Sequence, residues 1–300
     1  MSSHTPAYLL DIQEGRHGIW FEKLLVSFSA ICSNRDQMIE KLRTFPLNDP
    51  ELGMIRILLH GPVGAGKSSF INSVKSAFAG RVVMSVLVDA LSSFSFTNKY
   101  ETHFIKEGEG RLPFVFNDVM GLETMESRGV HIDDIISALK GHIPEDYEFN
   151  PSVFLTNSKP EYIQDPKLSD KVHCLVSVVS ADKMSMMSKD TKDKMRTVRE
   201  KASLLGIPQI VVMTMVDTAC PEVARDLKNI YRSKHIKSMM QSCSNELGVP
   251  VNCILPVKNY HEETQGNNDI DVLVLEAMTK IVEVANDYIW HVQQKKKHLS

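Results

Sequence analysis

The stretch of the sequence most suited to chemistry is HGPVGAGKSSF, which runs from His60 to Phe70. It carries the spacing G-x-x-x-x-G-K-S, so that a lysine and a hydroxyl residue follow the second glycine. Glycines allow a loop to wrap around phosphate groups with successive backbone N–H groups pointing inward. A lysine at this position reaches the β and γ phosphates, and the hydroxyl after it binds Mg²⁺. The stretch therefore predicts a loop that binds a nucleoside triphosphate.

Such a loop must follow a strand and open a helix. Residues 54–59 are apolar apart from one arginine and are compatible with a strand. After the loop, Phe70, Val74 and Phe78 recur at helical spacing, which predicts an amphipathic helix. Both neighbours support the motif. The residues expected to bind phosphate are Gly61, Val63, Gly64, Ala65, Gly66, Lys67, Ser68 and Ser69.

The identity of the base depends on a residue further along the chain. Guanine presents two parallel donors, which a single carboxylate can accept together. GTP-binding proteins supply this carboxylate from an [NT]KxD motif at the end of a strand. Here the sequence TMVD places Thr214 and Asp217 after an apolar run, but Met215 replaces the lysine. In this interpretation Asp217 accepts hydrogen bonds from guanine. The alternative is that Asp217 only caps the next helix. Lys258, in the sequence LPVKN, is expected to lay its methylene stem on the purine.

Two further segments match the switch regions of GTP-binding proteins. Asp118 and Gly121 form a D-x-x-G sequence after the apolar run LPFVFN. Asp118 is expected to hold Mg²⁺ through water, and the Gly121 N–H to contact the γ-phosphate. Thr97 is our choice for the threonine of the other switch, and it would join Ser68 and Asp118 around the metal ion. Thr102 is the alternative, although it would lie inside a strand.

Two positions predict slow hydrolysis of the bound nucleotide. Efficient Ras-like enzymes have a glutamine after the glycine of D-x-x-G, where it orients the attacking water. This chain has Leu122, which cannot form that hydrogen bond. Those enzymes also favour glycine at the third position of the loop, where Val63 is expected to crowd the γ-phosphate. Both changes affect the positioning of water more than the binding of phosphate.

The remaining sequence alternates short apolar runs with amphipathic ones. This alternation predicts an α/β fold with a mainly parallel sheet and helices on both faces. Together with the glycine-rich loop and the two segments typical of GTP-binding proteins, it predicts the P-loop NTPase class, a Ras-like G domain. Besides the strand before the loop, we expect strands at 82–88, 100–105, 112–117, 172–179, 208–216 and 250–256. Helical patterns lie near 130–140, 189–204, 221–246 and 270–290.

The chain of 300 residues is long enough for one large domain with flanking segments. We expect a helical N-terminal flank over residues 1–50, helical around 20–41, and a G-like domain over 51–292. Residues 141–170 have little periodicity and are expected to form an insertion before a further strand of the same sheet. Residues 293–300 are expected to form a basic tail.

Composition limits the classes of function. A net charge of −3 gives no overall attraction to nucleic acid, and no nucleic-acid partner is expected. Five cysteines occur without CxxC spacing, which is typical of reduced thiols in a cytoplasmic protein. No secretory signal is evident, and no apolar run reaches the ~20 residues that a transmembrane helix needs. We therefore expect a cytoplasmic protein without a transmembrane segment.

With these residues identified, the chain resembles the interferon-induced protein 44 family, including its 44-like members. The resemblance covers roughly residues 45–290. It is carried by HGPVGAGKSSF, TNKYETHFIKEGEGRLPFVFNDVMGLE, GHIPEDYEFNP and LPVKNYHEE. It implies a cytoplasmic protein that is similar to small GTP-binding proteins, induced by interferon or infection, and associated with antiviral activity. Longer members carry an N-terminal TLDc-like domain, for which 50 residues are too few, so we expect a short paralogue.

These observations lead to three hypotheses about function. The first is a switch that binds GTP or GDP with Mg²⁺, hydrolyses GTP slowly and contacts a protein partner in innate immune signalling. The second is a pseudo-GTPase that serves as an interaction scaffold with little or no turnover. The third is a P-loop enzyme that uses ATP, against which Asp217 is the main argument. The protein partner and the oligomeric state stay open.

Overall fold

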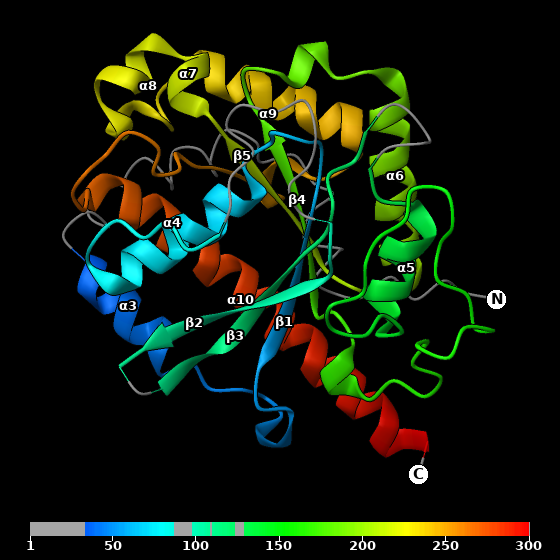
Figure 1. Cartoon of the computed structure of the whole chain (residues 1–300). Coiled ribbons are helices and arrows are strands. Elements are labelled where there is room, and N and C mark those ends of the chain that lie inside the picture. Colours follow the sequence, from blue (N-terminus) through cyan, green and yellow to red (C-terminus); the bar gives the residue numbers. More distant parts are fainter. Residues whose placement is uncertain (1–33, 87–97, 109, 124–128, 300) are drawn as a thin grey trace.

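The computed structural model describes residues 34–86, 98–108, 110–123 and 129–299. Within them a six-stranded sheet has the order β2-β3-β1-β4-β5-β6 (Figure 1). The strands are β1 (Ile55–His60), β2 (Glu101–Glu107), β3 (Gly110–Asp118), β4 (Cys174–Ser180), β5 (Gln209–Thr214) and β6 (Ile254–Pro256). Neighbouring strands are parallel except for β2 and β3, which form an antiparallel pair at one edge. The chain therefore has the predicted α/β P-loop NTPase fold.

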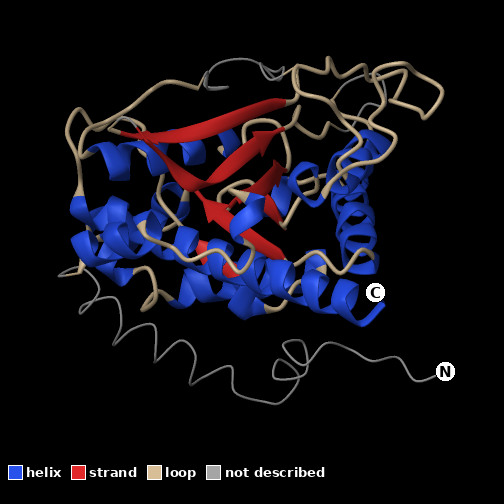
Figure 2. Ribbon diagram, turned by 90° about the horizontal axis from the view of Figure 1, so that it is seen from below, coloured by secondary structure: helices blue, strands red, loops and turns tan. Residues whose placement is uncertain are grey.

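The central strands are nearly continuous apolar runs because both faces of the sheet are covered. Every residue of β4 is buried. Helices α3 (Arg35–Arg43), α4 (Lys67–Ala79) and α10 (Asn268–Leu299) pack together on one face. Helices α5 (Ile132–Lys140), α6 (Lys189–Leu204) and α9 (Lys234–Leu247) cover the other, and Figure 2 shows the sheet between the two layers.

Short helices connect the main elements. They are η1 (Pro50–Leu52), η2 (Leu168–Asp170), η3 (Met184–Met186), α7 (Val216–Ala219), α8 (Pro221–Arg225), η4 (Leu227–Asn229) and η5 (Val251–Cys253). Residues 141–167 form turns and loops before β4, and they are anchored by buried side chains such as Ile143 and Phe149. None of the described helices combines the length and the apolar character needed to cross a membrane.

The strand predicted at 82–88 is wrong over residues 82–86, and its last two residues lie outside the described part of the chain. Side chains of α4 bind the backbone of this segment and take the place of a neighbouring strand. The Ser76 hydroxyl accepts a hydrogen bond from the Val83 N–H at 2.8 Å. The Asn72 amide accepts from the Ser85 and Val86 N–H groups and donates to the Val86 carbonyl.

The helical pattern predicted over 221–246 is interrupted in the structure. Asp226 has an extended backbone after α8, and its carboxylate accepts a hydrogen bond from the Lys228 N–H at 3.0 Å. Ser233 caps α9 by accepting from the Ile236 N–H at 3.2 Å. The last predicted helix is longer than expected, since α10 continues to Leu299 and includes most of the expected basic tail.

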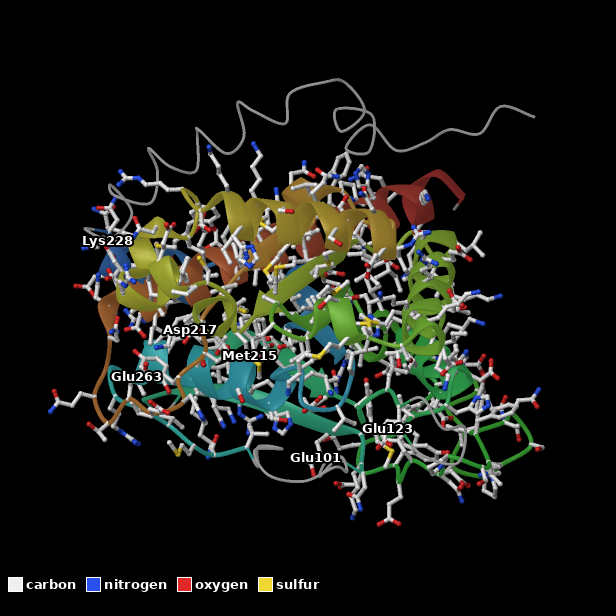
Figure 3. The ribbon with its side chains drawn as sticks, turned by 90° about the horizontal axis from the view of Figure 1, so that it is seen from above. Glu101, Glu123, Met215, Asp217, Lys228 and Glu263 are labelled. Carbon is white, nitrogen blue, oxygen red and sulfur yellow. The ribbon has the colours of Figure 1, made fainter. Side chains whose placement is uncertain are left out.

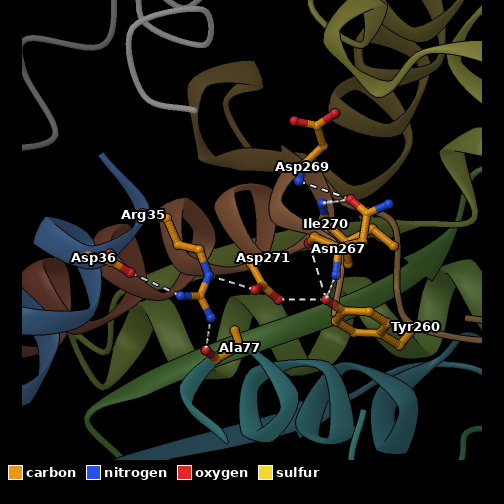
Figure 4. Close-up of polar contacts among 8 residues, drawn as sticks. All are labelled: Arg35, Asp36, Ala77, Tyr260, Asn267, Asp269, Ile270 and Asp271. Carbon is orange, nitrogen blue, oxygen red and sulfur yellow. Dashed lines mark hydrogen bonds and ion pairs between the residues drawn. The ribbon is translucent and has the colours of Figure 1, made fainter. Parts of the chain in front are cut away.

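A buried carboxylate connects α3, α4 and α10 to the loop after β6 (Figure 4). Asp271, at the start of α10, accepts hydrogen bonds from Arg35 Nε at 2.7 Å and from the Tyr260 hydroxyl at 2.8 Å. Arg35 also donates to the Ala77 carbonyl in the last turn of α4. The Tyr260 N–H donates to the Ser73 hydroxyl on α4. This network fixes the position of Tyr260 relative to the helix that follows the glycine-rich loop.

Replacing Arg35 should test how much this network stabilises the fold. The Asp271 side chain is only 4% exposed, so Arg35→Ala leaves a buried charge without its cation. We expect a loss of about 3–5 kcal/mol in the free energy of unfolding. Lys41→Ala is the matched control on the same helix, because the pair of Lys41 with Glu283 is exposed. It should cost below about 1 kcal/mol. Urea unfolding measures the free energy of unfolding of both variants. Equal losses would contradict a stabilising role for the pair of Arg35 with Asp271.

Candidate functional site

The glycine-rich loop connects β1 to α4 and lies directly on β4. Gly61 has φ 148°, and a Cβ at this position would lie 2.1 Å from the Val178 carbonyl oxygen. Only glycine permits this approach. Gly66, at the other end of the loop, precedes α4 with φ 91°, in the left-handed region that favours glycine. The loop therefore directs the N-terminus of α4, with the N–H groups of its first turn, toward the space above it.

The lysine and the serine of the motif lie at the start of α4. The Lys67 ammonium donates to the Gly61 and Pro62 carbonyls at 3.3 Å each, and the residue is 5% exposed. The Ser68 hydroxyl donates to Asp118 Oδ2 at 3.1 Å. Asp118 is fully buried at the end of β3. The structure thus brings together two of the three residues that the sequence suggested for Mg²⁺.

These two oxygen ligands suit Mg²⁺. This ion is usually held by one or two protein oxygens, with water and substrate phosphates completing its octahedron. Among the described residues, no group of three or more His, Cys, Asp or Glu side chains is arranged to hold a metal ion by itself. Thr97, the third expected ligand, lies outside the described residues. Its alternative, Thr102, lies inside β2 as expected, and its hydroxyl donates to Glu145.

Thr214 attaches the end of β5 to the loop. Its hydroxyl lies 2.7 Å from the Ala65 carbonyl oxygen, to which it donates a hydrogen bond. Met215 follows with φ 55° and ψ 34°, a left-handed conformation that is uncommon for a side chain of this size. Its sulfur lies 2.9 Å from the Ser180 hydroxyl at the end of β4. Thr214 therefore positions the loop, and Met215 lies against the neighbouring strand.

Asp217 lies in α7, two residues after Met215, and Figure 3 shows both residues in the same region of the molecule as Glu263. The Lys258 ammonium lies 3.5 Å from Asp217 Oδ2 and 2.7 Å from Glu263 Oε1. Burial opposes the charge on Lys258, but its bonds to Glu263 and Asp217 outweigh burial and raise the pKa of its ammonium. Lys258 is thus held beside Asp217 by charge, and its expected contact with a purine stays a prediction.

The D-x-x-G segment is attached to the loop through its backbone. The Leu122 N–H donates to the Gly61 carbonyl at 2.9 Å, and the Val63 N–H donates to the Leu122 carbonyl at 3.3 Å. A Cβ on Gly121 would lie 2.5 Å from Val63 Cγ2, so the two residues are in close contact. The Leu122 side chain is 2% exposed. Val63 therefore packs on the segment that was expected to contact the γ-phosphate.

The loop forms one wall of a cavity of about 280 Å³. Its other walls come from the segments after β4, β5 and β6, and ligands of open α/β sheets bind at this edge, beyond the carboxyl ends of the strands. The cavity thus joins the residues expected for phosphate to the aspartate expected for the base. It is lined by Gly64, Gly66, Lys67, Ser68, Ser69, Asp182, Lys183, Met215, Asp217, Thr218, Asn259, Tyr260 and His261.

Sequence analysis missed two lining residues that contact the loop or lie close to it. The Asn259 amide donates to the Gly66 carbonyl at 3.2 Å, and its own carbonyl oxygen is buried without a hydrogen-bond partner among the described residues. Its place directly after Lys258 in LPVKN was a usable signal. Lys183 lies near Gly64 from the segment after β4, where no motif points to it.

His60, at the end of β1, has a structural role. It is fully buried, and its Nε2 lies 2.7 Å from the Ser177 hydroxyl on β4. Complete burial, reinforced by the nearby Lys67 ammonium, lowers the pKa of His60 to about 3. The imidazole is therefore neutral at physiological pH and adds no charge beneath the loop.

The chain is similar to proteins named interferon-induced protein 44, although no protein-family model matches it. It is 34% identical to interferon-induced protein 44 of Mus musculus over 254 residues, which cover 84% of this chain and 60% of the relative. It is 33% identical to interferon-induced protein 44-like of Homo sapiens over 259 residues, or 85% and 57% of the two chains. The chain thus spans less than two thirds of the length of these relatives.

Solved structures are similar to parts of the chain at low sequence identity. A probable GTP-binding protein engB aligns with 77% of this chain and 99% of its own, at 14% identity and a TM-score of 0.42. The protein ttk003000868 from Thermus thermophilus aligns with 66% of this chain and 22% of its own, at 13% identity and a TM-score of 0.36. The strand order of the chain itself defines its fold.

Proposed function

We propose that this chain, whose matched region belongs to the interferon-induced protein 44 family, binds GTP and GDP with Mg²⁺ and acts as a slowly hydrolysing nucleotide switch. The observation that carries this proposal is the cavity in which Lys67 and Ser68 face the same space as Asp217. A phosphate-binding loop and a carboxylate suited to guanine thus line one site.

The phosphate groups are proposed to lie on the loop. Its backbone N–H groups and the N-terminus of α4 attract negative charge, and the Lys67 ammonium would turn from the loop carbonyls to the phosphate oxygens. Ser68 and Asp118 would hold Mg²⁺, which neutralises phosphate charge when it is bound. Thr97 is retained as a proposed ligand from outside the described residues.

The base is proposed to be guanine. A carboxylate at position 217 accepts from the N1–H and 2-amino groups of guanine, whereas adenine offers a donor beside an acceptor. Thr214 holds the loop against the end of β5 through its hydrogen bond to the Ala65 carbonyl. Lys258 stays beside Asp217 and orients its carboxylate while its methylene stem covers the purine. This arrangement favours GTP over ATP.

Slow turnover follows from the residues near the γ-phosphate. The buried side chain of Leu122 has no group that orients an attacking water. The Val63 side chain fills the space next to Gly121. A smaller residue at position 63 would leave room there for an attacking water. Because phosphoryl transfer depends on positioning and charge stabilisation, these features reduce the rate more than the affinity.

The biological setting is proposed from the family. The names of the relatives describe induction by interferon, which supports a role in innate immune or antiviral responses. A cytoplasmic location and a protein partner are proposed with it. Because the chain spans less than two thirds of these relatives, this activity is proposed for the G-like domain alone. The pseudo-GTPase scaffold is the second candidate, and Leu122 and Met215 are the departures that favour it.

Lys67→Ala should abolish or strongly weaken the binding of GTP and GDP, because each charge-assisted hydrogen bond to phosphate contributes about 1.5–3 kcal/mol. Titration calorimetry in Mg²⁺ measures both affinities. Lys75→Ala is the matched control, because Lys75 lies on the same helix and bonds to Ser85 away from the cavity. Unchanged GTP affinity in a folded Lys67→Ala protein would rule out the phosphate-binding loop.

Asp217→Asn should shift the preference from guanine to xanthine nucleotides. The asparagine amide donates to the 2-oxo group of xanthine, whereas the carboxylate matches the 2-amino donor of guanine. Competition between GTP, XTP and ATP for the cavity measures the shift. A wild-type protein that binds ATP as well as GTP, together with a variant that shows no shift, would exclude the guanine assignment.

Intrinsic hydrolysis of GTP should be slow, at ~10⁻⁴–10⁻² per second. Val63→Gly combined with Leu122→Gln should raise it, because the change restores space and a polar group for the attacking water. Single-turnover formation of GDP from preloaded protein measures both rates. A wild-type rate near one per second without a partner would show that the chain positions water through another group.

A further inference from the structure

We propose that Lys183 is a further nucleotide ligand, whose ammonium binds the α- and β-phosphates from the β4 side of the loop. It supplies the positive charge that is lost where Met215 replaces the lysine of the [NT]KxD motif. The inference rests on the proposed binding of a nucleotide to this cavity.

The position of Lys183 over the loop carries the inference. A Cβ on Gly64 would lie 4.0 Å from Lys183 Nζ, so the ammonium lies beside the middle of the glycine-rich loop. The backbone N–H groups of such a loop cradle the α- and β-phosphates. Lys183 also lines the same cavity as Lys67 and Asp217. Its ammonium thus lies on a second side of the space that the phosphates are proposed to fill.

Met215 and Lys183 line the same cavity near the end of β4. The Met215 side chain contacts the Ser180 hydroxyl, three residues before Lys183. A lysine at position 215 would therefore start from the same corner of the cavity from which Lys183 approaches Gly64. This chain thus has a methionine after β5, where the [NT]KxD motif has a lysine, and a lysine in the segment after β4.

The charge of Lys183 is available for a ligand. Its neighbour Asp182 accepts a hydrogen bond from the Ser180 hydroxyl, which holds that carboxylate at the end of β4. Among the described residues, the Lys183 ammonium has no ion pair or side-chain hydrogen bond, and the residue is exposed. An exposed cation beside a phosphate loop attracts the anionic part of a nucleotide without the cost of breaking an existing pair.

Calorimetric titration with GTP and with GDP tests this role. Lys183→Ala should lower both affinities about tenfold, which is the lower end for a charge-assisted hydrogen bond. The two nucleotides should lose equally because they share the α- and β-phosphates. Lys183→Arg should keep most of the affinity. The matched control is Lys189→Ala, since Lys189 is an exposed lysine at the start of α6, outside the cavity lining. The Lys189→Ala protein should bind GTP and GDP with wild-type affinity.

The same substitution in a Met215→Lys background separates this role from a general effect of charge. Lys183→Ala should cost less there, because lysine at 215 supplies the cation. Wild-type affinity in Lys183→Ala, equal losses in both backgrounds, or an equal loss in Lys189→Ala would each overturn the inference. If the wild-type protein binds neither GTP nor GDP, the proposed function itself fails. That result is distinct from wild-type binding of GTP and GDP by the Lys183→Ala protein, which would contradict only the role of Lys183.

Discussion

The close contact between the glycine-rich loop and β4 determines how the site is assembled. At Gly61 the backbone approaches the Val178 carbonyl so closely that no side chain fits between them. Because the loop lies this low on the sheet, the Thr214 hydroxyl reaches Ala65 from the end of β5, and Ser68 reaches Asp118 at the end of β3. A single steric constraint thus allows the loop and the start of α4 to contact the ends of β3, β4 and β5.

The opposite wall of the cavity depends on a second constraint, which is the buried carboxylate of Asp271. A buried charge is costly unless it is paired and hydrogen-bonded, and Arg35 and Tyr260 provide both. Burial raises the pKa of Tyr260, so its hydroxyl keeps the proton that it donates. Because the Tyr260 N–H also binds Ser73 on α4, the loop after β6 and the phosphate loop are held by the same helix.

Sequence reasoning was reliable where local pattern and backbone geometry coincide. The P-loop NTPase fold was predicted from one motif and from alternating apolar runs, and the fold is confirmed. Reasoning was wrong at 82–86, where the apolar residues favour a strand but Asn72 and Ser76 take the backbone hydrogen bonds. It missed Lys183 because its position beside the loop depends on how the end of β4 packs, which no local spacing encodes. Asn259 was also missed, although it directly follows Lys258 in LPVKN. The pairing of Lys258 with Asp217 is equally non-local.

A switch requires that GTP and GDP contact the protein differently, because a ligand shifts an equilibrium only by its difference in affinity for the two states. In the proposed site, Asp217 and Lys183 face parts that both nucleotides share, so they would contribute affinity without that difference. The segment Gly121–Leu122 is the described element that lies against the loop where the γ-phosphate is expected, and it is held there by the Leu122 and Val63 N–H bonds. A γ-phosphate that accepts a hydrogen bond from the Gly121 N–H, as the D-x-x-G sequence predicts, would add a contact to this segment that GDP lacks. The replacement of glutamine by leucine removes the water-orienting group but keeps this backbone connection. The substitutions that distinguish this chain from efficient enzymes are thus compatible with the proposed switch, since that switch would use the backbone of this segment, whereas rapid hydrolysis needs its side chain.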